Sequence, residues 1–212
     1  MYGTILHWKD CIKMMKLAIE YTGKYTSLTR EDIIEEVRAR LSKNRFEHVL
    51  RVELTALELA EKYDIDREKT SIAALLHDVA KEEPDSEMRD LVISENLDLD
   101  LLQYGSQIWH APVGAVQARR DFEIIDEEIL NAIKYHTIGT PDMTDVEKVI
   151  FVADYIEPGR NFDGVKKARK LADKSLDRVI QYKIKDTIVD LVARKKKIYP
   201  KAIDSYNAWI PK

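Results

Sequence analysis

Residues 71–81 of the chain read SIAALLHDVAK, a run of small and aliphatic side chains that ends in a histidine, an aspartate, two apolar residues and a lysine. The apolar residues leave almost no polar face at helical spacing, which is typical of a helix buried on all sides. Pro84 follows, and a proline disfavours a helical conformation at the residue before it. We therefore expect residues 72–80 to form a central helix, with His77 and Asp78 near its buried end.

Start signals place further helices on both sides of this run. Thr29 and Thr144 each open a capping box, because an acidic residue follows three positions later, and Asp126 can cap another helix. Pro112 suits the first turn of a helix, where its missing N–H costs little. With no alternating strand pattern, we expect an all-α fold, a helical bundle. Its expected helices span residues 4–20, 29–41, 46–63, 72–80, 112–122, 126–136, 144–157 and 175–194, with shorter ones within 86–103 and after Pro200.

The composition limits the function classes. The 212 residues carry 34 basic and 38 acidic side chains, a net charge of −4, which argues against a nucleic-acid partner. The single cysteine, Cys11, excludes a disulfide framework and a cysteine-based metal site. No apolar run approaches the length of a membrane span and no signal-peptide pattern opens the chain, so we expect a cytoplasmic protein without a membrane partner. The length suits one domain, expected at residues 29–212, preceded by an N-terminal helical extension at 1–28.

The chain has five histidines, and four of them fall at expected helix ends or on inward faces. The pair His77-Asp78 is the feature to explain, because two adjacent polar side chains at a buried helix end need partners. Imidazoles and carboxylates from separate helices could converge there on a divalent cation. A lone histidine in such a place is more often a packed or capping residue, and His7 keeps that interpretation. The residues that could join the pair are His48, His110, His136 and Asp154.

The order of these residues resembles that of the HD-domain metallophosphohydrolases. Their pattern is a histidine, a downstream His-Asp pair and a distal aspartate, which here are His48, His77-Asp78 and Asp154. Lys81 extends the pair to the HD-x-x-K form that is common in the superfamily. The resemblance implies the helical HD-domain fold for residues 29–212.

Within that superfamily the chain is most similar to the YqeK family. His110 and His136 fall where the two-metal branch of the superfamily has its additional histidines. The resemblance covers nearly the whole chain after residue 28. Its matching stretches are residues 44–48, 75–81, 110–115 and 132–137, and most distinctively the run ADYIEPGR at 153–160.

The resemblance implies symmetrical hydrolysis of diadenosine tetraphosphate to two ADP by a metal-activated hydroxide. It also implies two divalent cations, and a ligand set of histidine and aspartate favours iron, with manganese, cobalt, nickel or zinc as alternatives. Asp78 would bridge the two cations as a catalytic residue. The ligands of one cation would be completed by His48, His77 and Asp154, and those of the other by His110 and His136.

The substrate's phosphates require positive charge beside the metals. Lys81 follows Asp78 by one helical turn, and we expect it to bind phosphate and to stabilise charge in the transition state. Arg160 can hold a phosphate with two hydrogen bonds, and Arg45 is a second candidate for that task. Thr137 and Gly139 are expected to line the nucleotide pocket through their backbone.

Two alternatives stay open. The same site could serve another nucleotide or an alarmone, as in other HD branches, or the chain could be a nucleotide-binding protein without catalysis. The presence of all six ligand positions and Lys81 argues against the second alternative. The basic run at residues 194–197 is interpreted as charge that complements the end of a long helix. Both a monomer and a homodimer are compatible with the sequence.

Overall fold

The computed structural model describes residues 19–210, which form ten α-helices and one short 3-10 helix and contain no β-strand. The all-α prediction is confirmed. In this range no helix is both long and apolar enough to cross a membrane. The elements are α2 (Arg30–Arg40), α3 (Lys43–Tyr63), α4 (Arg67–Leu76), α5 (Asp85–Ser94), η1 (Leu99–Gln103), α6 (Ser106–Asp121), α7 (Glu127–Tyr135), α8 (Asp145–Ile156), α9 (Val165–Ala172), α10 (Leu176–Ala193) and α11 (Pro200–Trp209).

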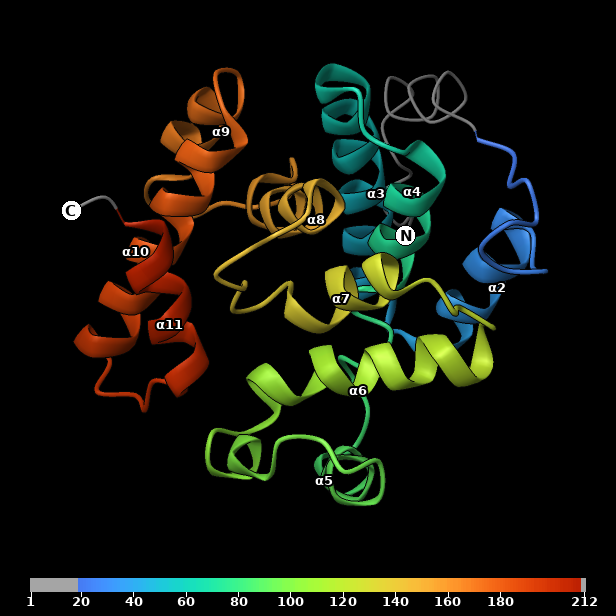
Figure 1. Ribbon diagram of the computed structural model, residues 1–212, viewed down its shortest axis with the longest axis horizontal. Helices are drawn as coiled ribbons and strands as arrows, with labels where there is room; N and C mark the ends of the chain where they lie inside the picture. Colours follow the sequence, from blue (N-terminus) through green and yellow to red (C-terminus); the bar gives the residue numbers. More distant parts are fainter. Residues whose placement is uncertain (1–18, 211–212) are drawn as a thin grey trace, which may run out of the picture.

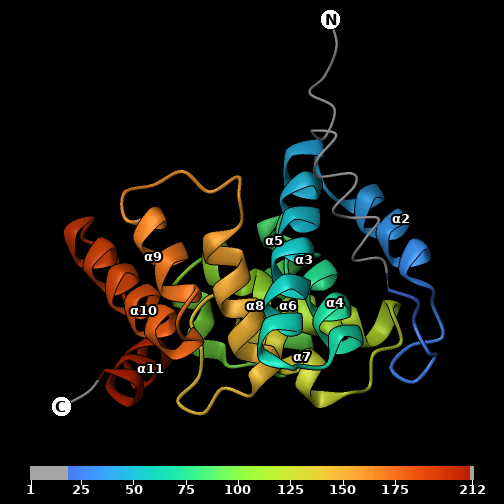
Figure 2. The same cartoon turned by 90° about the horizontal axis from the view of Figure 1, so that it is seen from above.

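Helices α3, α4, α7 and α8 pack together in the middle of the molecule, and α6 packs against α7, with α5 on the far side of α6 (Figure 1). Helices α9, α10 and α11 form a group on the side of α8, whereas α2 lies on the opposite side (Figure 2). The side chains of Ile72, Leu75 and Leu76 in α4 have no exposed surface. The run at residues 71–81 therefore lies at the centre of the fold, as its apolar character predicts.

Local hydrogen bonds explain where several helices begin. Thr29 and Thr144 each form the complete capping box that the sequence predicts. Asp126 accepts hydrogen bonds from two backbone N–H groups in the first turn of α7. Each cap satisfies N–H groups that have no partner inside the helix, so α2, α7 and α8 begin where the sequence predicts. The predicted end of α3 at Tyr63 is also confirmed.

The central helix is shifted towards the N-terminus relative to the prediction, because it begins at Arg67 instead of Ile72. It ends at Leu76 instead of continuing to Ala80, and residues 77–82 form turns. The backbone N–H of Lys81 donates to the carbonyl of Asp78, three residues earlier, which is tighter than an α-helix. Adjacent side chains of an α-helix diverge by about 100°, but here His77 Nε2 lies 3.4 Å from Asp78 Oδ2. Both side chains therefore reach one site, although they are adjacent in sequence.

The prediction that Pro112 starts a helix is wrong. α6 begins at Ser106, so Pro112 lies inside it and His110 lies within the helix, not before it. A proline inside a helix costs roughly 3 kcal/mol because one hydrogen bond is lost. Trp109 and Val113 on the same helix are less than one tenth exposed, and their burial offsets that cost.

The structure also differs from the prediction at α9 and in the segment before α2. α9 was not predicted, because eight residues provide only two turns in which to recognise helical spacing. Residues 19–28 are irregular, but Tyr25 belongs to the core and the Thr26 hydroxyl donates to the carbonyl of Phe122. Most of the helix expected at residues 4–20, with His7 and Cys11, lies outside the described residues. The division into residues 1–28 and 29–212 stays a prediction.

Candidate metal centre

Four histidines converge on Asp78 in the interior. His48 comes from the second turn of α3 and His110 from α6, whereas His77 and His136 are the C-cap residues of α4 and α7. None of the four is more than 5% exposed, and Asp78 is 3% exposed. Because water cannot solvate groups at this depth, their polar atoms depend on partners within the protein.

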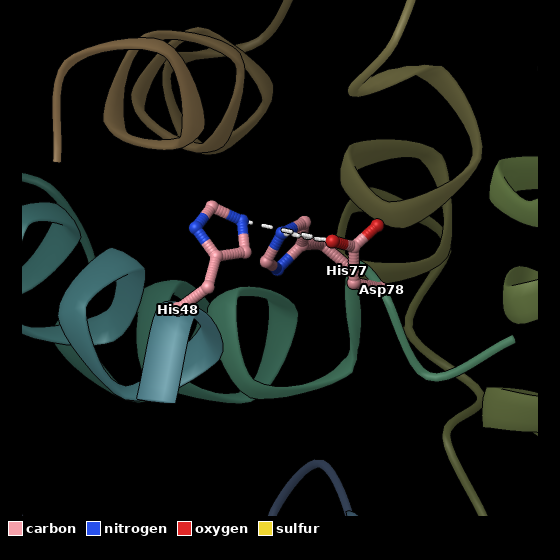
Figure 3. Close-up of side chains that lie close together, drawn as sticks. All are labelled: His48, His77 and Asp78. Carbon is pink, nitrogen blue, oxygen red and sulfur yellow. Dashed lines mark ion pairs between the residues drawn. The ribbon is translucent and has the colours of Figure 1, made fainter. Parts of the chain in front are cut away.

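The two carboxylate oxygens of Asp78 divide the cluster. Oδ2 lies 3.6 Å from His48 Nε2 and 3.4 Å from His77 Nε2, and Figure 3 shows both contacts. Oδ1 lies 3.2 Å from His110 Nε2 and 3.6 Å from His136 Nε2. Two sets of potential metal ligands result. We call His48, His77 and Asp78 the first ligand group, and Asp78, His110 and His136 the second ligand group.

Hydrogen bonds on the outer side of each imidazole fix its orientation. The Nδ1 atoms of His77, His110 and His136 lie 2.7, 3.0 and 2.8 Å from the backbone carbonyl oxygens of Ala74, Ser106 and Ile133, respectively. A carbonyl only accepts, so these contacts place a proton on Nδ1 and leave the lone pair on Nε2. All three Nε2 atoms face Asp78, where each is available to bind a cation. A second hydrogen bond of this kind is typical of histidines that bind metals.

The inner atoms of the cluster fit a divalent cation. Nε2 of His48 and of His77 are buried without a hydrogen-bond partner, and leaving such atoms unpaired is costly. In the second ligand group the Nε2 atoms of His110 and His136 are 3.2 Å apart, and two facing lone pairs gain from a cation. Imidazole nitrogen with carboxylate oxygen is a donor set that suits first-row transition metals.

Asp154 and Glu157 approach His48 from α8 and its C-cap. Asp154 Oδ1 lies 3.3 Å from His48 Nε2, so the predicted distal aspartate does reach the cluster. Glu157 Oε1 lies 3.1 Å from His48 Nδ1, and Glu157 Oε2 accepts a hydrogen bond from Arg51 Nε. Glu157 holds His48 in position, a role that sequence reasoning missed although the residue belongs to the distinctive ADYIEPGR run. Burial alone would lower the pKa of His48, but the nearby carboxylates of Asp154 and Glu157 raise it.

The charges of the cluster suit metal binding at neutral pH. Burial would raise the pKa of Asp78, but His77, His110 and His136 outweigh it and hold that pKa well below its usual range. Burial, together with the neighbouring histidines, lowers the pKa of His136 to about 4. Asp78 is therefore an anion and His136 a neutral imidazole, the forms in which each residue binds a metal.

The predicted phosphate-binding cations surround the cluster. Arg45 Nη1 donates to Asp78 Oδ2 at 2.9 Å, and Lys81 Nζ lies 3.3 Å from His110 Nδ1. Arg160 donates to the carboxylate and the backbone carbonyl of Asp154. Burial lowers the pKa of Lys81. The structure thus brings all three cations to the candidate centre: Arg45 and Arg160 bond the two aspartates, and Lys81 faces His110.

A fourth cation, Lys183 on α10, was not singled out from the sequence. Its Nζ donates to the backbone carbonyls of His136 and Phe151 and lies 3.5 Å from Asp154 Oδ2. Burial lowers the pKa of Lys183 to about 8, against the opposing effect of Asp154. Burial would raise the pKa of Asp154, but Lys183 first, then His48, hold it well below the usual range. Nothing in the local pattern around residue 183 distinguishes this lysine from its neighbours.

A cavity of about 730 Å³ lies next to the second ligand group. Thr137, which lines it, directly follows His136, and Gln107 lies one helical turn before His110. Its other walls come largely from α10 and α11 and the segment between them, including Ile184, Thr187, Ile188, Leu191, Tyr199 and Ala202. Arg194, Lys196 and Lys197 are also part of the lining, so most of the basic run does more than end a helix.

Gly139, unlike Thr137, does not line this cavity. Its φ is +69°, and a Cβ at this position would lie 2.2 Å from the terminal methyl of Met143 and 3.5 Å from the Phe151 ring. That Gly139 lines the nucleotide pocket through its backbone stays a prediction. Packing and the left-handed backbone conformation require the glycine.

Known proteins resemble this chain over most of its length. Residues 45–159 match the family described as "HD domain". The "Bis(5'-nucleosyl)-tetraphosphatase, symmetrical" of Bacillus subtilis (strain 168) is 43% identical over 183 residues, which are 86% of this chain and 98% of that protein. The protein of the same description from Staphylococcus aureus (strain NCTC 8325 / PS 47) is 44% identical over 172 residues, 80% of this chain and 89% of that protein.

A solved structure agrees with the fold. It is the crystal structure of a "predicted HD superfamily hydrolase involved in NAD metabolism" from Clostridium acetobutylicum. The two chains superpose with a TM-score of 0.79 at 34% sequence identity, over 86% of this chain and 97% of the other.

Proposed function

The chain belongs to the HD-domain family, and we propose that it is a metal-dependent phosphohydrolase that cleaves diadenosine tetraphosphate symmetrically into two ADP. One observation carries the proposal: Asp78 faces a pair of histidines with each of its carboxylate oxygens, deep in the protein. The relatives described as symmetrical bis(5'-nucleosyl)-tetraphosphatases support the choice of substrate.

We propose that the two ligand groups hold two divalent cations, with Asp78 shared between them and Asp154 added to the first. Iron is our choice for the cell, because nitrogen and oxygen ligands without cysteine suit it, and manganese, cobalt, nickel or zinc would fit the same donors. When bound, the two cations would favour deprotonation of the attacking water and polarise a phosphoryl oxygen.

The chain's own residues then act on the phosphates. Arg45, Lys81 and Arg160 would bind the polyphosphate, since each stands within hydrogen-bonding reach of a ligand group and can turn from its present partner to a phosphate oxygen. The water oxygen forms a bond to one of the two central phosphorus atoms, and the central bridging P–O bond breaks. Lys81 is placed to stabilise the negative charge that develops on the phosphate oxygens as this bond breaks. One water proton is released, and both products are ADP.

The cavity beside the second ligand group would hold one nucleoside end of the substrate. Its volume of about 730 Å³ falls within the range of small-molecule sites, about 300–1,000 Å³. Apolar side chains from α10 suit a base, and the cations at residues 194, 196 and 197 suit phosphate oxygens. Thr137 connects this cavity to the second ligand group through His136. We also propose a cytoplasmic location, where a soluble nucleotide is available, and leave the choice between monomer and homodimer open.

Product analysis tests this function. The protein is purified anaerobically, supplied with Fe²⁺ or Mn²⁺ and incubated with diadenosine tetraphosphate, and the nucleotides are separated by chromatography. We expect ADP alone. The formation of ATP plus AMP, or no cleavage with either metal, would contradict the proposal. A nucleotide and alarmone panel run in parallel would then identify the alternative substrate.

A further inference from the structure

Lys183 is a buried lysine with three oxygen partners. It stands on α10, outside residues 45–159 that match the HD domain, and only 5% of it is exposed. Its Nζ lies 3.8 Å from the centroid of the Phe151 ring, so its charge also faces an aromatic surface. A lysine this deeply buried is costly unless its ammonium is fully bonded.

Two of the three partners of this ammonium connect it to the two ligand groups. Nζ donates to the backbone carbonyl of His136 at 3.2 Å and to that of Phe151 at 2.8 Å, and Asp154 Oδ2 lies at 3.5 Å. An ammonium has three N–H groups, so these three oxygens account for all of them. His136 belongs to the second ligand group, whereas Asp154 contacts His48 of the first. One side chain thus connects both halves of the candidate centre.

The contact with Asp154 also selects which carboxylate oxygen faces the centre. Lys183 is near Oδ2, and the opposite oxygen, Oδ1, is the one that lies 3.3 Å from His48 Nε2. Arg160 also bonds Oδ1, but its side chain is 35% exposed, against 6% for Lys183. Arg160 is therefore free to move to another partner, and Lys183 is the partner that keeps the carboxylate plane in place.

We propose that Lys183 is a positioning residue that holds His136 and Asp154, one on each side of the centre, in the arrangement that binds the two metals. This inference rests on the proposed metal-dependent function, but not on the identity of the substrate. It makes α10 part of the metal centre, although the helix supplies no ligand. The same helix lines the cavity with Ile184, Thr187 and Ile188, so it connects the two sites.

Two roles of the lysine charge predict opposite results. A cation near a metal site repels the metal, so a lysine that only balanced charge would weaken metal binding, and its removal would tighten it. A lysine that positions the ligands strengthens metal binding, because removing an outer partner of a ligand typically costs about 10–100-fold in affinity. The direction of the change therefore separates the two roles.

The test measures Mn²⁺ binding to metal-free protein by competition with a fluorescent chelator, without substrate. The variants are Lys183→Met, which keeps the length and apolar stem of the side chain, and Lys185→Met, a matched change at an exposed position of the same helix. We expect Lys183→Met to weaken Mn²⁺ binding about 10–100-fold and Lys185→Met to bind like the wild type. Unchanged or tighter binding by Lys183→Met would overturn the proposal.

Circular dichroism checks that the variants are folded at the temperature of the titration. Should Lys183→Met unfold, Lys183→Gln carries the test, because its amide can bond a buried carbonyl but is shorter and lacks the charge that faces Asp154. We expect it too to bind Mn²⁺ more weakly than the wild type. Affinity equal to the wild type in Lys183→Gln would also overturn the proposal. Since no substrate is present, a wild-type protein that binds Mn²⁺ but does not cleave diadenosine tetraphosphate would contradict the proposed substrate and leave the role of Lys183 intact.

Discussion

Helices α3 to α8 and the turns that follow them carry all six candidate metal ligands, whereas α10 and α11 carry none. Helices α10 and α11, which we call the second part, instead supply much of the wall of the cavity and the buried Lys183. The ligands share a sequence order that identifies a family. The residues of α10 act through where the helix packs, which no local pattern reveals. The comparison separates residues that perform the chemistry from residues that position them and shape the pocket.

The largest effect is expected from Asp78, which both ligand groups share. Asp78→Ala removes a ligand from each group at once, so we expect hydrolysis to fall by about 10³-fold or more. Helical content should stay near that of the wild type. Steady-state kinetics and far-UV circular dichroism check this, with Asp142→Ala at an exposed position as the control. Activity within tenfold of the wild type would remove Asp78 from the centre.

Replacing Lys183 in the second part should change the free energy of unfolding and its dependence on pH. Burial lowers the pKa of Lys183 to about 8 from an ordinary value of 10.5. Between these values the unfolded chain binds more protons than the folded one, so the buried lysine makes stability rise with pH. For metal-free protein, the stability of the wild type minus that of Lys183→Met should increase from pH 8 to pH 10.5, by up to about 3 kcal/mol. Urea unfolding at several pH values measures it, and a flat or falling difference would show that the lysine is not buried as described.

A glycine in the ligand-bearing part separates packing from backbone strain. Gly139 and Gly23 both have positive φ values, +69° and +77°, but a Cβ would meet Met143 at the first and nothing within 4 Å at the second. We expect Gly23→Ala to cost about 1 kcal/mol and Gly139→Ala about 2–3 kcal/mol. Urea unfolding at pH 7 compares them. Equal losses would mean that Met143 moves aside and that packing does not require this glycine.

The smallest effect is expected at the rim of the cavity. Lys196→Ala removes a cation that lines it, and a single exposed charge contributes about 0.2–1 kcal/mol. KM for diadenosine tetraphosphate should therefore rise about two- to fivefold at low salt, with kcat unchanged, and the difference should shrink as salt increases. Lys185→Ala is the control outside the cavity. An effect on kcat alone would place Lys196 outside substrate binding.

Local signals in the sequence predict much of the fold and the identities of the ligands. Thr29, Asp126 and Thr144 mark helix starts because their side chains bond backbone groups only a few residues away. Pro112 misleads, because the burial of its neighbours on α6 outweighs a local preference. The tight turn after Leu76 also escapes prediction, because the apolar pattern continues through Val79 and Ala80.

Contacts between distant residues explain what sequence reasoning missed. Lys183 meets Asp154 and His136 only because α10 packs against α8, and its own neighbours in sequence carry no sign of that contact. The cavity likewise forms between elements separated by many residues. Glu157 offered a partial signal, since it belongs to the distinctive ADYIEPGR run, but its bond to His48 becomes evident only in the fold.

Metal content per chain shows whether Asp78 joins two cation sites. The wild type and His136→Ala are purified anaerobically, loaded with Fe²⁺, freed of excess metal and analysed by inductively coupled plasma mass spectrometry. Because His136 belongs to the second ligand group alone, the account predicts two cations per chain in the wild type and one in His136→Ala. One cation per chain in both proteins would contradict it.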